Sequence, residues 1–174
     1  MPADTLYEED IVTWSEQQAR AIRDLARTRP ELSNVIDWEN VAEEIETLGR
    51  SELKGVASHL RNALAHILKE ACDPGALSRV AWRGETQTSL REARDDFLPS
   101  MRQQLDFSLI WKKAFGQAAD SLTLYGVSIP PGIPEHPPFG LDDVLDSEFN
   151  HERGVAILTS VMAASKDTTE GTKS

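Results

Sequence analysis

Residues 37–52, Asp-Trp-Glu-Asn-Val-Ala-Glu-Glu-Ile-Glu-Thr-Leu-Gly-Arg-Ser-Glu, decide the predicted fold because they carry the clearest helical pattern in the chain. Asp37 is placed to cap the helix by accepting a hydrogen bond from the free amide of Asn40. At about 100° per residue, Val41, Ile45 and Leu48 fall on one side of this helix. Three glutamates fall on the opposite side and are expected to face solvent: Glu39, Glu43 and Glu46. The stretch therefore predicts an amphipathic helix.

The same stretch closes on Gly49, and Ser51 follows soon after. Glycine at a helix end adopts positive φ without a steric penalty, and serine is a preferred N-cap. The next apolar stripe, which runs from Leu53 to Ile67, is rotated by about 60 to 80° from the first. We therefore predict a break or kink at Gly49 between two helices, the second of which ends near Cys72.

Helical spacing of apolar residues recurs in the rest of the chain. One helix is predicted from Thr5 to just before Pro30. Residues 73–84 read as a loop that includes Trp82 and Arg83, and two further helices follow before Gly126. No run alternates as a strand does, so the predicted fold class is all-α, a helical bundle of about five helices.

The C-terminal third is expected to be irregular. Five prolines between residues 130 and 138 predict a proline-rich extended arm from about residue 127. From residue 150 onward the chain is mostly polar or small, which predicts a mobile tail. The predicted organisation is a single helical domain over residues 1–149, with a flexible tail over residues 150–174.

Composition limits the classes of function. A chain of 174 residues with 40% hydrophobic residues suits one domain of ordinary size. The net charge of −11 argues against a general affinity for nucleic acid or an anionic membrane. The only cysteine, Cys72, cannot form an internal disulfide, and neither a signal peptide nor an apolar run long enough to span a membrane is apparent. A cytoplasmic protein is expected.

One group of residues could carry chemistry. Glu44 lies about 60° from Val41, at the margin of the apolar stripe, so it is expected to be partly buried and to need a partner. His59 and His66 are seven residues apart and share one side of their helix. If Glu44 meets either imidazole at a helix seam, the group could bind a divalent metal or transfer protons. The other interpretation is a structural hydrogen bond or ion pair, because no metal-cage motif accompanies these residues.

A second group is basic. Net charge is −8 over residues 1–49, +3 over residues 50–113 and −6 over residues 114–174. The middle segment carries Trp82 and six basic residues: Arg50, Lys69, Arg79, Arg83, Arg91 and Arg94. Arginine beside tryptophan suits phosphate or carboxylate recognition and contacts with partners, and Arg50, Lys69, Trp82 and Arg83 are the candidate binding residues. Pairing with the chain's own acidic residues is the alternative.

Several of these segments resemble the DUF29 family, a bacterial family without an assigned function. The resemblance rests on Asp37 to Glu52, Leu60, His66 to Lys69, Trp82 with Thr86, and Leu98 to Ser100, and it covers about residues 6–149. The sequence departs from the family at Glu70 to Cys72, where members tend to have an aromatic residue, and at Ala81, where a serine usually precedes the tryptophan. The resemblance implies an α-helical fold and a cytoplasmic bacterial protein, without implying an activity.

Two functional hypotheses remain open. The first is a non-enzymatic helical module that binds another protein or itself, because no recognisable catalytic or metal motif is present. The second is a metal-assisted or acid/base enzyme that uses Glu44 and His66, with His59 as a further ligand. Specific nucleic-acid binding through the basic middle is a third, lesser possibility.

Overall fold

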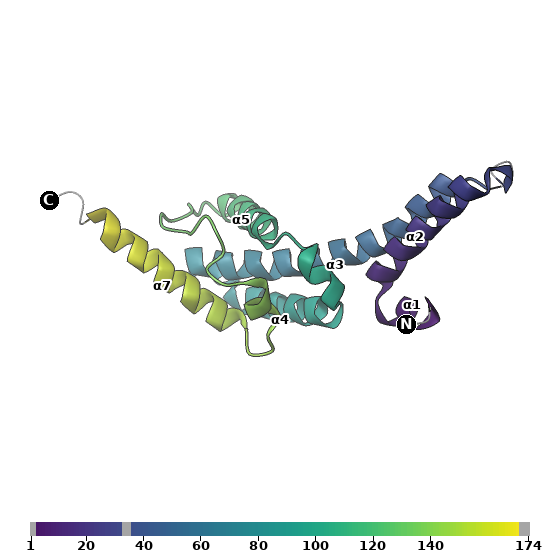
Figure 1. Cartoon of the computed structure of the whole chain (residues 1–174). Coiled ribbons are helices and arrows are strands. Elements are labelled where there is room, and N and C mark those ends of the chain that lie inside the picture. The colour runs from purple at the N-terminus through teal and green to yellow at the C-terminus, as the bar shows by residue number, and fades with distance from the viewer. Residues whose placement is uncertain (1–2, 33–35, 171–174) are drawn as a thin grey trace. The chain divides into compact units, whose positions relative to one another are not determined.

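The computed structural model describes residues 3–32 and 36–170, and these residues form seven α-helices, two short 3-10 helices and no strand. In chain order (Figure 1) the elements are α1 Ala3–Glu9, α2 Ile11–Thr28, η1 Pro30–Leu32, α3 Trp38–Cys72, α4 Arg79–Asp95, η2 Pro99–Gln103, α5 Phe107–Leu124, α6 Leu141–Leu145 and α7 His151–Glu170. The predicted all-α class is confirmed. The chain divides into two compact units, Met1–Val56 with Asp96–Leu105, and Ala57–Asp95 with Asp106–Ser174.

The first unit begins with two helices where the sequence predicted one. Asp10 separates them and caps α2, since its carboxylate accepts hydrogen bonds from the amide of Thr13 at 2.9 Å and from its hydroxyl at 2.8 Å. Ser100, in η2, donates a hydrogen bond to the same carboxylate at 2.9 Å. One capping residue therefore starts α2 and also holds the 96–105 segment beside it.

Helix α3 runs without interruption through Gly49, so the predicted break at this glycine is wrong. The cap at the start of α3 is as expected, since Asp37 accepts a hydrogen bond from the amide of Asn40 at 3.3 Å. Gly49 is buried within the helix and does not have positive φ. A Cβ atom placed there would lie 2.3 Å from Oγ of Ser15 and 3.2 Å from Cα of Val12. The glycine therefore allows α2 and α3 to approach closely, which is a different use from ending a helix.

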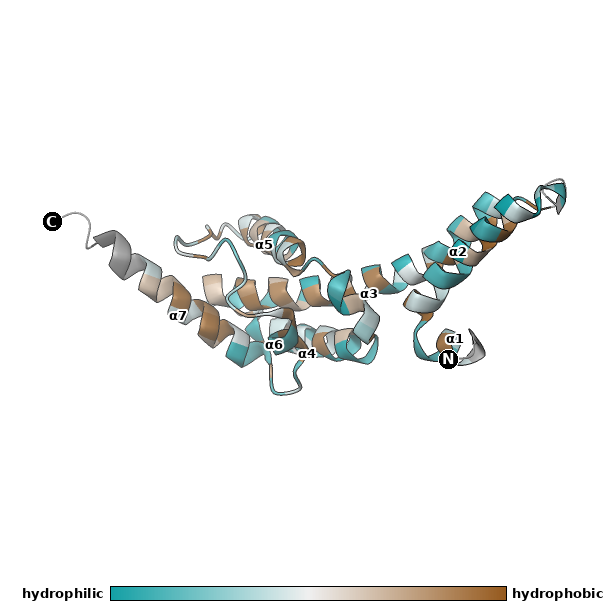
Figure 2. Cartoon of the chain, in the orientation of Figure 1, coloured by the Kyte–Doolittle hydropathy of each residue, from teal (hydrophilic) through white to brown (hydrophobic). Residues whose placement is uncertain are grey.

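The second unit contains the larger core. Every residue from Ala63 to Glu70 in α3 is buried, and Figure 2 shows hydrophobic residues recurring along this part of the helix. The largest fully buried side chains of the second unit come from α3, α4, α5, the segment before α7, and α7: Leu60, Leu64, Ile67, Leu68, Leu90, Trp111, Leu122, Phe149 and Leu158. Trp82 and Arg83 lie in α4, so residues 79–84 of the predicted loop are helical instead.

The proline-rich segment after α5 contains no helix or strand before Leu141, as its prolines predict. It is nevertheless anchored, because Phe139 is buried and makes edge contacts with Trp111 and Phe149 at ring distances of 5.9 and 5.1 Å. The indole nitrogen of Trp111 also donates a hydrogen bond to the carbonyl of Pro134 at 3.2 Å. An extended arm is not confirmed, since these contacts attach the segment to the core of the second unit.

The mobile tail predicted from residue 150 is wrong for the residues described, because His151–Glu170 form helix α7. Asn150 accepts a hydrogen bond from the amide of Arg153 at 2.9 Å, which satisfies the start of the helix. His151, Leu158 and Met162 are buried at helical spacing. Burial against the second unit thus orders a segment that looks polar in isolation. Residues 171–174 of the predicted tail lie outside the described residues.

Candidate functional site

A buried polar cluster joins three helices of the second unit. Arg83 of α4 binds the carboxylate of Glu70 of α3 with two nitrogens, Nη2 to Oε1 at 2.6 Å and Nε to Oε2 at 3.2 Å. Nε2 of His151, the first residue of α7, lies 2.9 Å from Oε2 of the same carboxylate. On its other side, Nδ1 of His151 lies 2.8 Å from the hydroxyl of Thr86 in α4. The four side chains form one continuous network.

The partners of Glu70 favour its charged form. The hydrogen bond from Arg83 is the main cause that lowers the pKa of Glu70, and the bond to His151 adds to it, although burial opposes both. Glu70 is therefore a carboxylate at neutral pH, and Nε2 of His151 has to carry a proton to donate to it. The single hydroxyl proton of Thr86 is within hydrogen-bonding distance of two acceptors, the carbonyl of Trp82 and Nδ1 of His151, each at 2.8 Å. Each buried group therefore has a partner, which is the condition for burying it at small cost.

The cluster combines a hydroxyl, an imidazole and a carboxylate, the same groups that form hydrolytic triads. Thr86, however, has no exposed surface, and its hydroxyl is bonded within its own helix. A nucleophile has to reach its substrate, so Thr86 cannot act as one in this conformation. The arrangement is better suited to fixing α7 against α3 and α4.

Two histidine and glutamate pairs lie along the antiparallel α3 and α4 helices. Nδ1 of His59 is 3.0 Å from Oε2 of Glu92, and Nε2 of His66 is 2.6 Å from Oε2 of Glu85. The histidines are seven residues apart on α3 and the glutamates seven apart on α4, so the pairs repeat every two turns. The carboxylate partners of the histidines are therefore on α4.

Glu44 does not have the environment that its position predicted. It is exposed and belongs to the first unit, whereas His59 and His66 belong to the second. The expectation of partial burial is wrong, because the seam of α3 with α2 uses Ala42 and Gly49 and leaves Glu44 outside. Among the described residues, no group of three or more metal-binding side chains could hold a metal ion.

His66 is the more buried of the two histidines. Burial lowers its pKa from 6.5 to about 4, the charge of Lys69 acts in the same direction, and Glu85 opposes both. Burial prevails because Nδ1 is buried without a hydrogen-bond partner, so protonation would add an unsatisfied N–H donor. Glu85 is itself largely exposed, and water weakens its attraction. His66 is therefore a neutral side chain at physiological pH.

The candidate basic patch is divided between the two units. Arg50 lies in the first unit, where it contacts Glu46 at 3.4 Å and the hydroxyl of Thr47 at 2.7 Å. In the second unit, Nζ of Lys69 lies 5.2 Å from the ring centre of Trp82, and burial lowers its pKa. Arg83 is bound to Glu70, as described above. Partners within the chain thus occupy these four residues, and their role in binding stays a prediction.

A smaller pocket of about 430 Å³ lies in the second unit beside the polar cluster, since Arg83 and His151 line it. Arg83 and Arg94 both line it, but neither is available as a simple anion site. Arg94 donates hydrogen bonds to the carbonyls of Val144 and Phe149 at 3.0 and 2.7 Å. Because its two cations are already engaged, the pocket does not by itself point to an anionic ligand.

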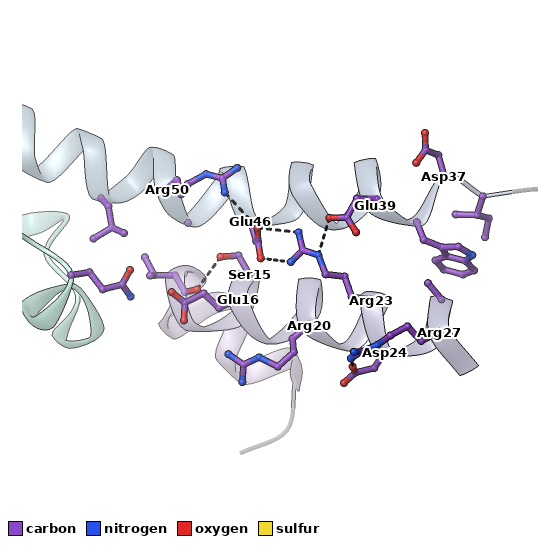
Figure 3. Close-up of a pocket in the computed structure, with 17 residues that line it drawn as sticks. Ser15, Glu16, Arg20, Arg23, Asp24, Arg27, Asp37, Glu39, Glu46 and Arg50 are labelled. Carbon is purple, nitrogen blue, oxygen red and sulfur yellow. Dashed lines mark hydrogen bonds and ion pairs between the residues drawn. The ribbon is translucent and has the colours of Figure 1, made fainter. Parts of the chain in front are cut away.

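The first unit contains a larger groove, of about 1320 Å³, along one side of the α2 and α3 hairpin. Figure 3 shows Arg23 of α2 held between two glutamates of α3, Glu39 and Glu46. Its Nε is 3.0 Å from Glu39, and its two terminal nitrogens bind both oxygens of Glu46. Arg23 is the main cause that lowers the pKa of Glu46. Two of the three glutamates expected only to face solvent therefore link α3 to α2.

The opposite side of the same hairpin is apolar. The seam between the helices is made of small buried residues: Ser15 and Ala19 of α2, with Ala42 and Gly49 of α3. On each helix, the groove residues lie to one side of these positions, and an apolar stripe lies to the other. The stripes are Ile11, Trp14, Ile22 and Leu25 of α2, and Val41, Ile45 and Leu48 of α3. We call these seven residues the outer apolar face.

Much of the outer apolar face is open to solvent. Leu25 is 42% exposed, Val41 40% and Leu48 48%, and the other four residues are half-buried. Tyr7 of α1 packs on one end of the face, through an edge contact with Trp14 at 4.8 Å. The shared side that the sequence predicted for Val41, Ile45 and Leu48 is not the side that α2 covers, since α2 meets α3 along the smaller residues beside them. Neighbouring exposed apolar side chains of this kind mark interaction surfaces.

The described residues define an all-α protein in which a buried network of Glu70, Thr86 and His151 joins three helices. The sequence model of a family described as a domain of unknown function, DUF29, matches residues 6–150. The chain therefore belongs to the DUF29 family, as its resemblance over about residues 6–149 implied.

The chain is also similar to a solved structure. This is the crystal structure of an α-helical protein of unknown function from Rhodospirillum rubrum ATCC 11170, with 34% sequence identity and a TM-score of 0.78. The match covers 87% of this chain and 96% of the other. No curated protein matches the chain. No described helix is both long enough and apolar enough to span a bilayer.

Proposed function

We propose that this protein is a non-enzymatic protein-binding module, and that the outer apolar face is its binding surface. The observation that carries the proposal is the division of residues in the hairpin. Small residues occupy the seam, while larger apolar residues lie outside it and half-exposed. Burying such side chains on a partner stabilises a complex by about 25 cal/mol per Å² of apolar surface removed from water. A helical partner with a matching apolar stripe suits this surface.

The buried polar residues support the same proposal. Glu70, Thr86 and His151 are saturated by contacts within the chain, and Thr86 has no access to a substrate. Residues in such networks hold helices together more readily than they carry out chemistry. The enzymatic alternative needs Glu44 and His66 in one site, and the partner found for His66 is Glu85.

The test is capture of a partner from the native host by tagged protein. Leu48→Glu places a charge within the face on α3, at its most exposed residue, and Gln17→Glu places the same charge on an exposed position of α2 outside the face. We expect the wild type and Gln17→Glu to retain the same partner and Leu48→Glu to lose it, with helix content by circular dichroism unchanged. Equal capture by all three proteins, or no capture by any, would contradict the proposal.

A further inference from the structure

We propose that the outer apolar face is covered by a second copy of this chain, so that two hairpins form a four-helix bundle about a two-fold axis. This inference rests on the proposed function, because it uses the same surface, and it adds the identity of the partner. Three properties of the face favour a second copy as its partner: its symmetry, its area and its charge.

Symmetry favours a second copy. A two-fold interface requires a surface that is complementary to itself. The hairpin provides one, because it consists of two antiparallel helices that each carry an apolar stripe beside a common seam. Four-helix bundles pack two such pairs around one core. The hairpin lacks a core of this kind, since the residues between its two helices are small.

The position of Gln18 fits this symmetry. It is half-buried and lies between Trp14 and Ile22, near the middle of the α2 stripe. A glutamine amide both donates and accepts hydrogen bonds, so two copies of Gln18 can pair with each other across a two-fold axis. A single polar residue in an otherwise apolar helical interface commonly sets its register. In the dimer, Gln18, which interrupts the apolar stripe of α2, would therefore have a structural role.

The area of the face suits a weak, reversible dimer. The α2 stripe runs from Ile11 to Leu25 and is about 21 Å long, and the α3 stripe runs from Val41 to Leu48 and is about 10 Å long. With each helix about 10 Å wide, the face measures about 300 Å² on each copy. The pair would then bury about 600 Å², which is below the size of a standard interface. A dimer that dissociates on dilution is expected.

Charge allows the contact. None of the seven residues of the outer apolar face is charged, so two copies meet without burying an unpaired ion. Residues 1–49 nevertheless carry a net charge of −8, so the copies repel each other through the surrounding solvent. Salt screens this repulsion. Association should therefore strengthen as salt is raised, which is opposite to the behaviour of a dimer held by ion pairs.

The primary experiment is sedimentation velocity of the full chain over a wide range of concentrations at low and moderate salt. We expect the wild type and Gln17→Glu to pass from monomer to dimer, with more dimer at higher salt. Leu25→Glu and Leu48→Glu should remain monomeric at concentrations where the wild type is mostly dimer. A wild type that is monomeric throughout, or a dimer that both face variants retain, would overturn the proposal.

Cross-linking tests the two-fold geometry separately. In a Cys72→Ser background, Gln18→Cys should form a disulfide-linked dimer under mild oxidation, and Gln17→Cys should not. Equal cross-linking at both positions, or cross-linking at residue 17 alone, would exclude the proposed packing. The wild type could instead be monomeric and capture a different protein, which Leu48→Glu no longer captures. That result would overturn the second copy as the partner, but it would still support the proposed function. If Leu48→Glu captures the same protein as well as the wild type does, the proposed function itself is contradicted.

Discussion

Replacing glycine by alanine at two positions of α3 should have opposite effects on stability. Gly49 and Gly55 both lie inside this helix, so alanine at either position gains about 0.5–1 kcal/mol of helix propensity. At Gly55 the new Cβ meets nothing within 4 Å, so this gain should appear in full. At Gly49 the new Cβ would lie 2.3 Å from Oγ of Ser15, and 3.2 Å from the backbone Cα of Val12. Overpacking of this kind costs about 1–3 kcal/mol.

The two variants should therefore differ in their free energy of unfolding by about 1–3 kcal/mol. The difference isolates the seam, because the propensity gain is common to both. Urea unfolding followed by circular dichroism at 222 nm measures it directly, and the corresponding shift in Tm is about 2–4 °C for each kcal/mol in a chain of this size. If Gly49→Ala stabilises the protein as much as Gly55→Ala does, the close approach of α2 and α3 at this point is refuted.

A double variant identifies the atom responsible. Ser15→Ala removes the hydroxyl that the new Cβ would meet and leaves the contact with the backbone of Val12. Gly49→Ala should then lower the free energy of unfolding by about 1 kcal/mol less in the Ser15→Ala background than in the wild type, since substitutions of residues in contact do not have additive effects. The same cost in both backgrounds would assign the strain to the backbone contact alone.

Further measurements address the second unit. Gly154→Ala should destabilise the protein by about 1–3 kcal/mol, because its Cβ would lie 2.8 Å from Cδ1 of Ile67, whereas Gly116→Ala, in open space, should be neutral or stabilising; thermal melts compare them. Glu70 has a pKa below its usual 4.5, so the stability that its charged form contributes is complete above pH 4.5 and is lost as pH falls through the lowered pKa. The difference in free energy of unfolding between the wild type and Glu70→Gln should therefore narrow over that range, as acid unfolding curves would show. For His66, whose pKa is lowered from 6.5 to about 4, the unfolded chain takes up a proton first, so stability should decrease as pH falls from 6.5 to 4. An NMR titration of the imidazole carbons that gives a pKa at or above 6.5 would contradict this last expectation.

Periodicity in the sequence predicted most of the helical segments, but it did not show which side of α3 would meet α2. A hydrophobic stripe such as Val41, Ile45 and Leu48 is normally buried, and pattern analysis assigns it to the core. The seam that α3 forms with α2 uses Ala42 and Gly49, which contribute little to such a pattern. The close approach of the two helices depends on the absence of side-chain volume, and periodicity does not measure that.

The polar contacts of the second unit could be predicted only in part. The spacing of His59 and His66 indicated one shared helix side, and the matching spacing of Glu85 and Glu92 was the available signal for their partners. Using that signal requires the register between two helices, which depends on packing across the whole core. His151 lies in a segment that reads as a polar tail, so its contact with Glu70, 81 residues away in sequence, was outside the reach of local patterns.

The small seam and the outer apolar face depend on each other, and this dependence can be measured. Close approach of α2 and α3 brings two narrow apolar stripes together into one surface, so a wider seam would separate them. Gly49→Ala should therefore weaken self-association several-fold as well as lower stability, while Gly55→Ala, on the same helix and without a new contact, should leave the dimer unchanged. Sedimentation equilibrium of both variants, at a temperature where each is fully folded, provides the comparison. If Gly49→Ala is destabilised and still dimerises as tightly as the wild type, the stripes act independently, and the binding surface is a single helix.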